Sequence, residues 1–340
     1  MRYPNLKPKA TIGVTAPSSG VYEGLYFLVE QSRERLESRG YRLQIGETVW
    51  TQEKAKSAPA ARRAAEFMQM MEDDTIDIII PPWGGELLIE ILDQIDFGKF
   101  QLKWIFGFSD ISVLLLATTL KTGIATAQGA NLVDFRGEYF DKTTGMWEPV
   151  LQTLAGAAVT QYSSAKYQKT WNYVNPTPWV FNLTQTTEWK AIPNRDVHIK
   201  GRLLGGCLDA IRHLVGTPYG DVSTFRKQYT KGEGIIWHFE CYNLSPTSLR
   251  RTLVQMKYAG WFEDCTGILF GRNADGSAMN TPVDDYHIKD VYTELAAELQ
   301  IPVVYDIDCG HVPPQMTLIN GAVAEVSVKD GKGIIKQTFI

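Results

Sequence analysis

The sequence lacks the features that mark secreted, membrane-embedded or disulfide-rich proteins. It has four cysteines in 340 residues, Cys207, Cys241, Cys265 and Cys309, and no two of them form a CxxC pair. Such spacing predicts reduced, mostly buried thiols in a cytoplasmic protein. No apolar run approaches the ~20 residues that a membrane-spanning helix needs. The first twenty residues also lack the apolar core of a secretory signal.

Strong charge and the common cofactor motifs are missing as well. The formal net charge of -4 argues against binding to nucleic acid polymers or anionic membranes. Neither HxH nor HExxH occurs, and the N-terminal turn lacks the GxGxxG and GxxxxGK[ST] spacings. We therefore expect no metal and no cofactor, and a small molecule as the partner.

The first half of the chain alternates short apolar runs with amphipathic stretches. The apolar runs predict strands at 11–16, 42–45, 76–80 and 104–108, and the amphipathic stretches predict helices at 23–39, 59–72, 86–95 and 111–122. Strands that alternate with helices of this length predict βαβ units and a mainly parallel sheet covered on both faces.

The second half of the chain has a less regular pattern of apolar residues. Residues 162–196 carry several aromatic rings without a period, which indicates a linker or a functional loop. Beyond it the patterns predict helices at 203–215, 246–259 and 288–299, strands at 234–239, 267–270 and 303–305, and a terminal hairpin of 322–328 with 333–339. We expect an N-terminal α/β domain over 1–160, an aromatic loop over 161–198 and a C-terminal domain over 199–340.

The segment WIFGFSDIS places Ser109 between an expected strand and an expected helix. A serine at such a turn exposes its hydroxyl at the carboxyl end of the sheet, beside the free N–H groups of the helix. Gly107 fits the first glycine of a G-x-S-x-G elbow, whereas Ile111 replaces the second. Ser109 is thus a candidate nucleophile, and the alternative is a simple helix cap.

A serine nucleophile needs a base, and His311 is the histidine best placed for that role. It follows an expected strand and lies between Gly310 and a proline pair. Glu240, at the end of an expected strand, is our candidate for orienting it. His238 shares a face of that strand with Glu240, but two residues along a strand span about 7 Å, too far for a direct hydrogen bond. We interpret the other four histidines, His198, His213, His238 and His287, as structural.

The glycine pair in PPWGGE, Gly84 and Gly85, is the candidate oxyanion hole. Adjacent glycines let the backbone approach a ligand and present bare N–H groups. The alternative is an ordinary turn between strand and helix.

Together these segments resemble the LD-carboxypeptidase and microcin C immunity family of serine peptidases. The resemblance runs essentially from end to end and includes TIGVTAPSSG, the WGG turn, GFSD, GRLLGGCLDAIRHLVGTPYGD and DCGHVPPQM. It implies a flavodoxin-like N-terminal domain, like that of class I glutamine amidotransferases, with a β-rich C-terminal swivelling domain. It also implies a homodimer that needs neither metal nor cofactor.

The resemblance implies a catalytic triad of Ser109, Glu240 and His311. The backbone of Asp110 and the Gly84–Gly85 turn would supply the oxyanion hole. Trp83 stands where LD-carboxypeptidases often carry arginine, and Cys-Tyr-Asn follows Glu240 in place of an acidic-and-serine run.

The family has two branches, and the microcin C immunity branch is the more similar. That branch cleaves aminoacyl- or peptidyl-nucleotide antibiotics and sets an aromatic ring against the nucleobase. The aromatic loop residues Trp171, Trp179 and Trp189 are candidates for this ring, or they pack the loop onto the body. The alternatives are an LD-carboxypeptidase of murein tetrapeptides, a ligand-binding protein without catalysis, and an α/β-hydrolase esterase, which Ile111 contradicts.

Overall fold

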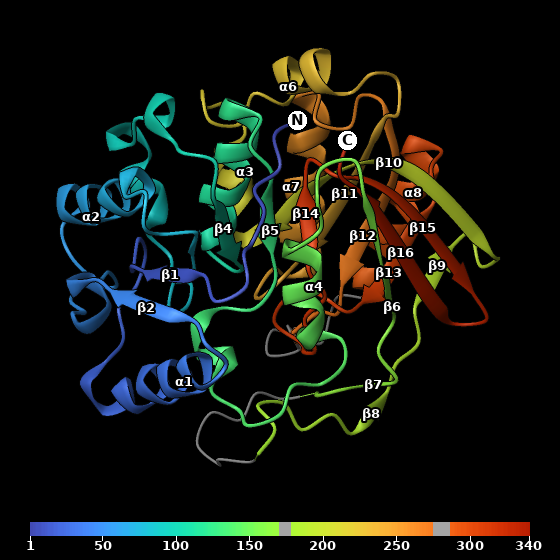
Figure 1. Ribbon diagram of the computed structural model, residues 1–340. Helices are drawn as coiled ribbons and strands as arrows, with labels where there is room; N and C mark the ends of the chain where they lie inside the picture. Colours follow the sequence, from blue (N-terminus) through green and yellow to red (C-terminus); the bar gives the residue numbers. More distant parts are fainter. Residues whose placement is uncertain (170–177, 275–285) are drawn as a thin grey trace.

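The computed structural model describes residues 1–169, 178–274 and 286–340, and two sheets form its frame. In Figure 1 the N-terminal sheet lies on the left and the larger C-terminal sheet on the right, with the two chain ends close together at the top. This mixed α/β architecture confirms the fold class that the alternation of strands and helices predicts.

The N-terminal sheet has six strands in the order β14-β5-β4-β3-β1-β2. Their bounds are β1 Thr11–Val14, β2 Arg42–Ile45, β3 Ile78–Ile79, β4 Trp104–Gly107, β5 Thr126–Gln128 and β14 Leu318–Asn320. Strands β1 to β5 are parallel and follow the flavodoxin-like order 2-1-3-4-5. Strand β14 pairs antiparallel with β5, so the end of the chain returns to complete this sheet.

The C-terminal sheet has eight strands in the order β6-β16-β15-β10-β11-β12-β13-β9. Their bounds are β6 Ala158–Tyr162, β9 Lys190–Ile192, β10 Val197–Cys207, β11 Ile235–Glu240, β12 Cys265–Gly271, β13 Val303–Ile307, β15 Val323–Lys329 and β16 Lys332–Thr338. The central strands β10 to β13 are parallel, and antiparallel strands flank them. A separate small ribbon pairs β7 Lys166–Tyr167 with β8 Gln185–Thr186.

Helices cover both sheets. The α-helices are α1 Tyr26–Ser38, α2 Ala60–Glu72, α3 Ile111–Thr122, α4 Trp147–Leu151, α5 Leu208–Ile211, α6 Val222–Tyr229, α7 Pro246–Tyr258 and α8 Ile288–Leu299. The 3-10 helices are η1 Glu23–Leu25, η2 Glu47–Trp50, η3 Leu88–Gln94, η4 Phe97–Lys99, η5 Leu132–Phe135, η6 Thr144–Met146 and η7 Arg212–Leu214.

Two expected helices differ from the structure. The helix predicted at 86–95 is the 3-10 helix η3, whose first N–H, that of Leu88, donates to the Asp110 carboxylate at 2.9 Å. This contact ties the start of η3 to another element. The helix predicted at 203–215 is wrong in its first part, because β10 continues to Cys207 before α5 and η7 begin. That end of β10 is buried on both faces, so its apolar run shows no strand period.

The cysteines and the helices of the structure agree with two expectations from composition. All four cysteines are free, and Cys265 is the one that is not fully buried. Within the described ranges, none of the helices has the length and apolar character needed to cross a membrane.

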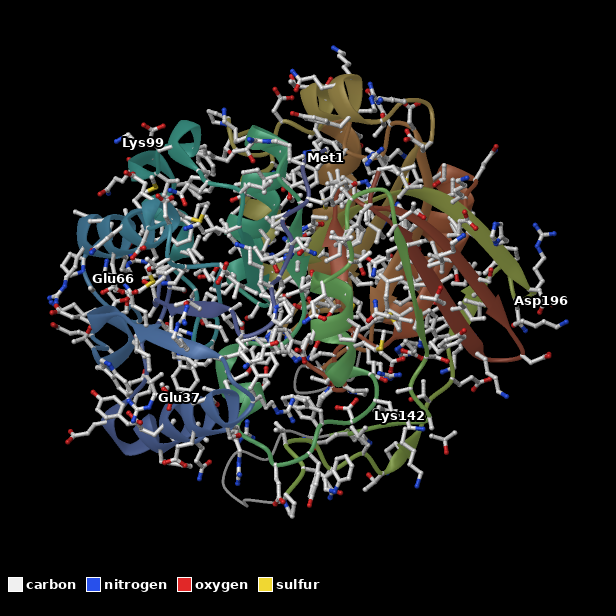
Figure 2. The ribbon with its side chains drawn as sticks, viewed as in Figure 1. Met1, Glu37, Glu66, Lys99, Lys142 and Asp196 are labelled. Atoms are coloured by element: carbon white, nitrogen blue, oxygen red, sulfur yellow. The ribbon has the colours of Figure 1, made fainter. Side chains whose placement is uncertain are left out.

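Helix α3 joins the two sheets. Each of its residues from Ile111 to Leu120 is buried, and one continuous core contains side chains of α3 together with side chains of β10 and β11. Figure 2 shows side chains filling the space between the sheets, with Glu66 and Asp196 on opposite sides of the molecule. The N-terminus of α3 therefore has a defined position relative to the C-terminal sheet.

Candidate active site

Ser109 lies in a strained turn between β4 and α3. Its φ of +66° is left-handed, a region that serine rarely adopts and that is enriched at functional sites. A Cβ at Gly107 would lie 2.8 Å from Oδ1 of Asn131, the atom that accepts the N–H of Phe108 at 3.2 Å. The glycine therefore lets the Asn131 side chain support the turn. This is the geometry of a nucleophile elbow, with its hydroxyl at the carboxyl end of a parallel sheet.

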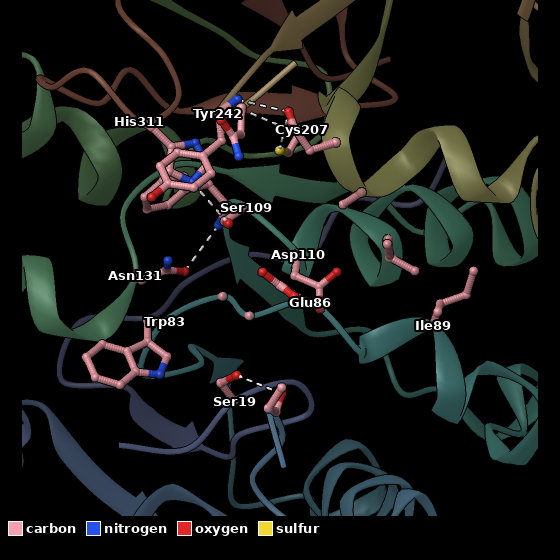
Figure 3. A pocket seen from close by; sticks show the side chains of 18 of the residues that line it. Ser19, Trp83, Glu86, Ile89, Ser109, Asp110, Asn131, Cys207, Tyr242 and His311 are labelled. Carbon is pink, nitrogen blue, oxygen red and sulfur yellow. Dashed lines mark hydrogen bonds between the residues drawn. The ribbon is translucent and has the colours of Figure 1, made fainter. Parts of the chain in front are cut away.

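A hydrogen-bonded series connects Ser109 to the other sheet. Nε2 of His311 lies 3.1 Å from Oγ of Ser109, and Nδ1 of His311 lies 2.7 Å from Oε2 of Glu240. Glu240 is the last residue of β11 and is fully buried, whereas the His311 side chain is 12% exposed. Figure 3 shows His311 directly above Ser109 in the cavity. The structure thus brings together the three residues that the sequence singles out.

The charges of this group support one another. Burial lowers the pKa of His311, but the carboxylate of Glu240 outweighs it, with Asp209 and Asp134 acting in the same direction, so the net pKa is raised. Burial raises the pKa of Glu240, and the charge and hydrogen bond of His311 outweigh that effect and lower it. Glu240 is therefore ionised, and His311 is a stronger base than a free imidazole.

The loop that carries His311 is held at Gly310. Its φ is +89°, and a Cβ there would lie 2.4 Å from Cβ of Glu240. Gln315 accepts the N–H of Gly310 at 3.1 Å and donates to its carbonyl oxygen. Only a glycine lets the loop pass this close to Glu240.

Two rings fix the plane of the His311 imidazole. Tyr242 lies with its ring centroid 4.5 Å away, and Phe108 packs edge-on at 5.1 Å. Tyr242 is 55% exposed, so much of its ring borders open space. Asp209 holds the Tyr242 segment by accepting its N–H at 2.9 Å. The sequence did not indicate Tyr242 as a site residue, because its contact with His311 joins distant parts of the chain.

The glycine turn after β3 faces the nucleophile. A Cβ at Gly84 would lie 2.7 Å from Oγ of Ser109 and 3.1 Å from the backbone nitrogen of Asp110. Gly85 has a φ of +149°, and a Cβ there would lie 2.2 Å from Oγ of Ser18. The carboxylate of Asp110 accepts a hydrogen bond from Ser18 at 2.5 Å. The backbone at Gly84 thus lies beside Ser109 with no side chain between them, which is where an oxyanion hole would need it.

Ser109 and His311 open onto a cavity of about 790 Å³. Its walls carry segments that follow β1, β3, β4 and β5, at the edge of the sheet where open α/β proteins bind ligands. The aromatic rings that line it are Tyr22, Trp83, Phe108 and Tyr242. His213 and Arg212 border it as well, although the sequence indicated only a structural role for His213.

The three candidate tryptophans do not gather at this cavity. Trp189 is a core residue with 1% exposure, and its Nε1 donates to Asp308 at 3.0 Å. This corrects the expectation that Trp189 contacts substrate, because its ring is packed beneath the sheet surface. Trp179 is 48% exposed, packs against Tyr139 and is not among the residues lining the cavity. Trp171 lies outside the described residues.

His238 has a structural environment. It is fully buried, and its Nε2 lies 3.0 Å from Oδ1 of Asn320. Burial lowers its pKa to about 4, so the ring is neutral. Of the histidines, His311 is the one bonded to both a serine and a carboxylate.

Among the described residues, one grouping of His, Cys and carboxylate side chains is close enough to share a metal. It comprises Cys207, Glu240 and His311, whose ligand atoms lie within 4.8 Å of one another. The imidazole and the carboxylate are already bonded to each other. Burial raises the pKa of the Cys207 thiol well above its ordinary value, which disfavours the thiolate that a metal needs.

A serine in an elbow at the end of a parallel sheet, bonded to a histidine that is bonded to a buried carboxylate, is the arrangement of serine hydrolases. The model of the LD-carboxypeptidase N-terminal domain matches residues 12–129, and that of the C-terminal domain matches 200–326. The chain belongs to this family of peptidases and is a serine-type peptidase hydrolase.

Relatives carry two kinds of name. The chain is 23% identical to the microcin C7 self-immunity protein MccF of Escherichia coli, over 94% of this chain and 90% of that protein. It is 24% identical to a probable murein peptide carboxypeptidase of Bacillus subtilis, over 98% and 95%. The structure of MccF in complex with aspartyl sulfamoyl adenosine matches with a TM-score of 0.83 at 20% identity, covering 100% of this chain and 99% of that one.

Substituting Gly310 by alanine tests the loop geometry. We expect Gly310→Ala to lower kcat by about 100-fold, because the new methyl group must displace His311 or Glu240. The matched control is Gly156→Ala, where φ is +87° and no atom lies within 4 Å of the added Cβ. Steady-state kinetics of both variants separate the contact from the backbone strain. Equal losses in the two variants would contradict this account.

Replacing Glu240 by glutamine tests the electrostatics. If His311 is the general base, the reaction requires its neutral form, so kcat/KM should fall as pH drops through its raised pKa. Because Glu240 raises that pKa, Glu240→Gln should move the acidic limb to lower pH and reduce the plateau by about 10⁴-fold. The measurement is the pH profile of kcat/KM, with Glu325→Gln on the surface as control. An acidic limb that stays in place would refute the assignment.

Proposed function

We propose that this protein hydrolyses an amide-type bond through a covalent acyl-serine intermediate. Oγ of Ser109 attacks the carbonyl carbon while Nε2 of His311 takes the hydroxyl proton, and the same imidazole then protonates the leaving amine. A water molecule, deprotonated by His311, releases the acid product and restores Ser109. The observation that carries the proposal is the series of contacts at 3.1 Å and 2.7 Å from serine to histidine to carboxylate.

The remaining catalytic groups stabilise the charges that develop during the reaction. Glu240 stabilises the imidazolium that forms during the attack. The backbone N–H groups of Asp110 and of the Gly84–Gly85 turn bind the oxyanion of the tetrahedral intermediate. The closeness of Gly84 to both Ser109 and Asp110 supports this assignment.

We propose aminoacyl- or peptidyl-nucleotide conjugates as the substrates, with detoxification of microcin C-like antibiotics as the role. MccF, which shares the fold over the whole chain, has been solved with aspartyl sulfamoyl adenosine. The cavity offers aromatic surface for a nucleobase at Tyr22, which is 58% exposed, and at Trp83, which lines the same cavity. The second candidate is hydrolysis of murein tetrapeptides, which the similarity to a probable murein peptide carboxypeptidase of Bacillus subtilis favours.

The proposal extends to the organisation of the protein. We propose that residues 1–160 supply the nucleophile and residues 199–340 supply Glu and His, with 161–198 between them. The positions of Ser109 after β4 and of Glu240 at the end of β11 support this division. A cytoplasmic homodimer remains our proposal on the basis of the family resemblance.

The nucleophile is tested with Ser109→Ala and His311→Ala. Each should reduce kcat by about 10⁶-fold, and the double variant should lose little more, because the two residues act as one unit. A fluorophosphonate probe should label the wild-type protein and not Ser109→Ala. The control is Ser223→Ala, an exposed serine on α6. Residual activity above about a tenth of wild type in Ser109→Ala would remove this serine from its role.

The substrate class is tested with Tyr22→Ala. If the ring stacks on a nucleobase, its loss should raise KM for an aminoacyl-sulfamoyl adenosine about 5- to 150-fold. Hydrolysis of an L,D-tetrapeptide, which has no base, should not change. Tyr258→Ala, at a ring that is 84% exposed, serves as control. Mass spectrometry of both substrates follows the products, and Trp171→Ala and Trp179→Ala extend the same series to the aromatic loop.

Two results would speak against this substrate class. Equal losses on both substrates would mean that Tyr22 has no role specific to a nucleobase. Cleavage of the tetrapeptide alone would favour the murein function instead, and the proposed triad would stand.

A further inference from the structure

A second cavity of about 370 Å³ adjoins the one at Ser109. Arg212 and His213, from η7, line both cavities, so the two share a wall. The other side of the second cavity is formed by α7 and includes Ser248 and Arg251. The two cavities are therefore neighbours, and Arg212 and His213 border both of them.

The second cavity is cationic. Arg212 and Arg251 both line it, and no aspartate or glutamate is among its lining residues. In the part of the chain that the structure describes, neither guanidinium forms an ion pair with a carboxylate. The next residue on α7, Arg250, is different, because it is paired with Glu294 and Glu298 of α8. Positive charge is thus neutralised on one side of α7 and left open on the side facing the cavity.

The groups beside the two guanidinium ions are neutral acceptors rather than carboxylates. Nη2 of Arg251 lies 3.4 Å from Oγ of Ser248, and Nε of Arg212 lies 3.4 Å from Nε2 of His213. Burial, with the charge of Arg212 acting in the same direction, lowers the pKa of His213. The site therefore holds two fixed charges, a hydroxyl and an imidazole. Guanidinium groups with hydroxyl neighbours are the usual partners of carboxylates and phosphates.

The first cavity has the opposite character near Ser109. Glu86, Asp110, Asp134 and Asp209 line it, and Arg212 is its single lysine or arginine among the described residues. A carboxylate or phosphate on the substrate would be repelled near these groups and attracted toward Arg212. The charge distribution thus gives an acidic substrate one preferred direction in the site.

We propose that Arg212 and Arg251, with Ser248, form an anion-binding subsite for a carboxylate or phosphate of the substrate, remote from the scissile bond. The inference rests on the proposed hydrolytic function. It assigns Arg251 as a specificity residue, because this side chain lines the second cavity and not the one at Ser109. It also predicts that the enzyme prefers substrates that carry an acidic group beyond the bond cleaved.

Two peptides that differ by one charge test the subsite. One is the tetrapeptide L-Ala-γ-D-Glu-L-Lys-D-Ala, and the other carries a carboxamide in place of the free glutamyl carboxylate. Arg251→Ala should raise KM about 10- to 100-fold for the acidic peptide and leave kcat unchanged, with little effect on the amide. Arg251→Lys should restore part of the loss. Lys257→Ala removes a charge from the same helix that is paired with Glu298, and should change neither peptide.

Binding without turnover separates this inference from the hydrolytic function. Titration calorimetry of Ser109→Ala with inorganic phosphate and with glutarate should show binding that is lost when Arg251→Ala is added. Tighter phosphate binding would indicate a phosphorylated substrate, and tighter glutarate binding a carboxylate. Equal KM changes for both peptides, or anion binding unaffected by Arg251→Ala, would overturn the subsite. If neither peptide is hydrolysed, calorimetry alone decides, and the hydrolytic proposal is judged by the Ser109 variants.

Discussion

The burial of helix α3 between the two sheets is the constraint on which the site depends. Ser109 precedes its first turn, while Glu240 and His311 belong to the C-terminal sheet and its loops. Oγ of Ser112, in that first turn, accepts the N–H of Cys207 at 2.9 Å, which ties the start of the helix to the end of β10. A close-packed core leaves such a helix little freedom to shift. The distance between nucleophile and base is thus set by packing.

Charge burial is the second requirement of the site. A fully buried carboxylate such as Glu240 is costly unless a partner compensates for its lost hydration. His311 supplies that compensation, and in return its affinity for a proton rises. Because Gly310 has no side chain, its loop can approach Glu240 closely enough for Nδ1 of His311 and Oε2 of Glu240 to lie 2.7 Å apart. Catalytic competence and the tolerance of a buried charge therefore have the same physical origin.

The cavity combines three kinds of surface within reach of Ser109. Bare backbone at Gly84 lies beside Ser109, and aromatic rings such as Tyr22 and Tyr242 line the cavity. Arg212 borders both this cavity and the cationic second cavity. Glu86, Asp110, Asp134 and Asp209 also line this cavity. Both the shape of the cavity and the positions of its charges can therefore orient a substrate.

The sequence by itself determined those features that depend on local periodicity and on termination signals. The helix predicted at 111–122 has the same bounds as α3, which ends at Gly123 in the left-handed conformation. The turn at Ser109 was also evident, because it lies between an apolar run typical of a strand and the start of that helix. A uniformly apolar run such as 203–207 carries no period, so the sequence could not distinguish a buried strand from a helix there.

Only the tertiary structure decided what joins distant segments. The pairing of β14 with β5, the burial of Trp189 and the approach of Tyr242 to His311 each connect residues far apart in the chain. The same holds for Arg212 and Arg251, which line one cavity although they lie on separate helices. Such contacts arise when whole helices and strands pack against one another, and local sequence patterns carry no information about that packing.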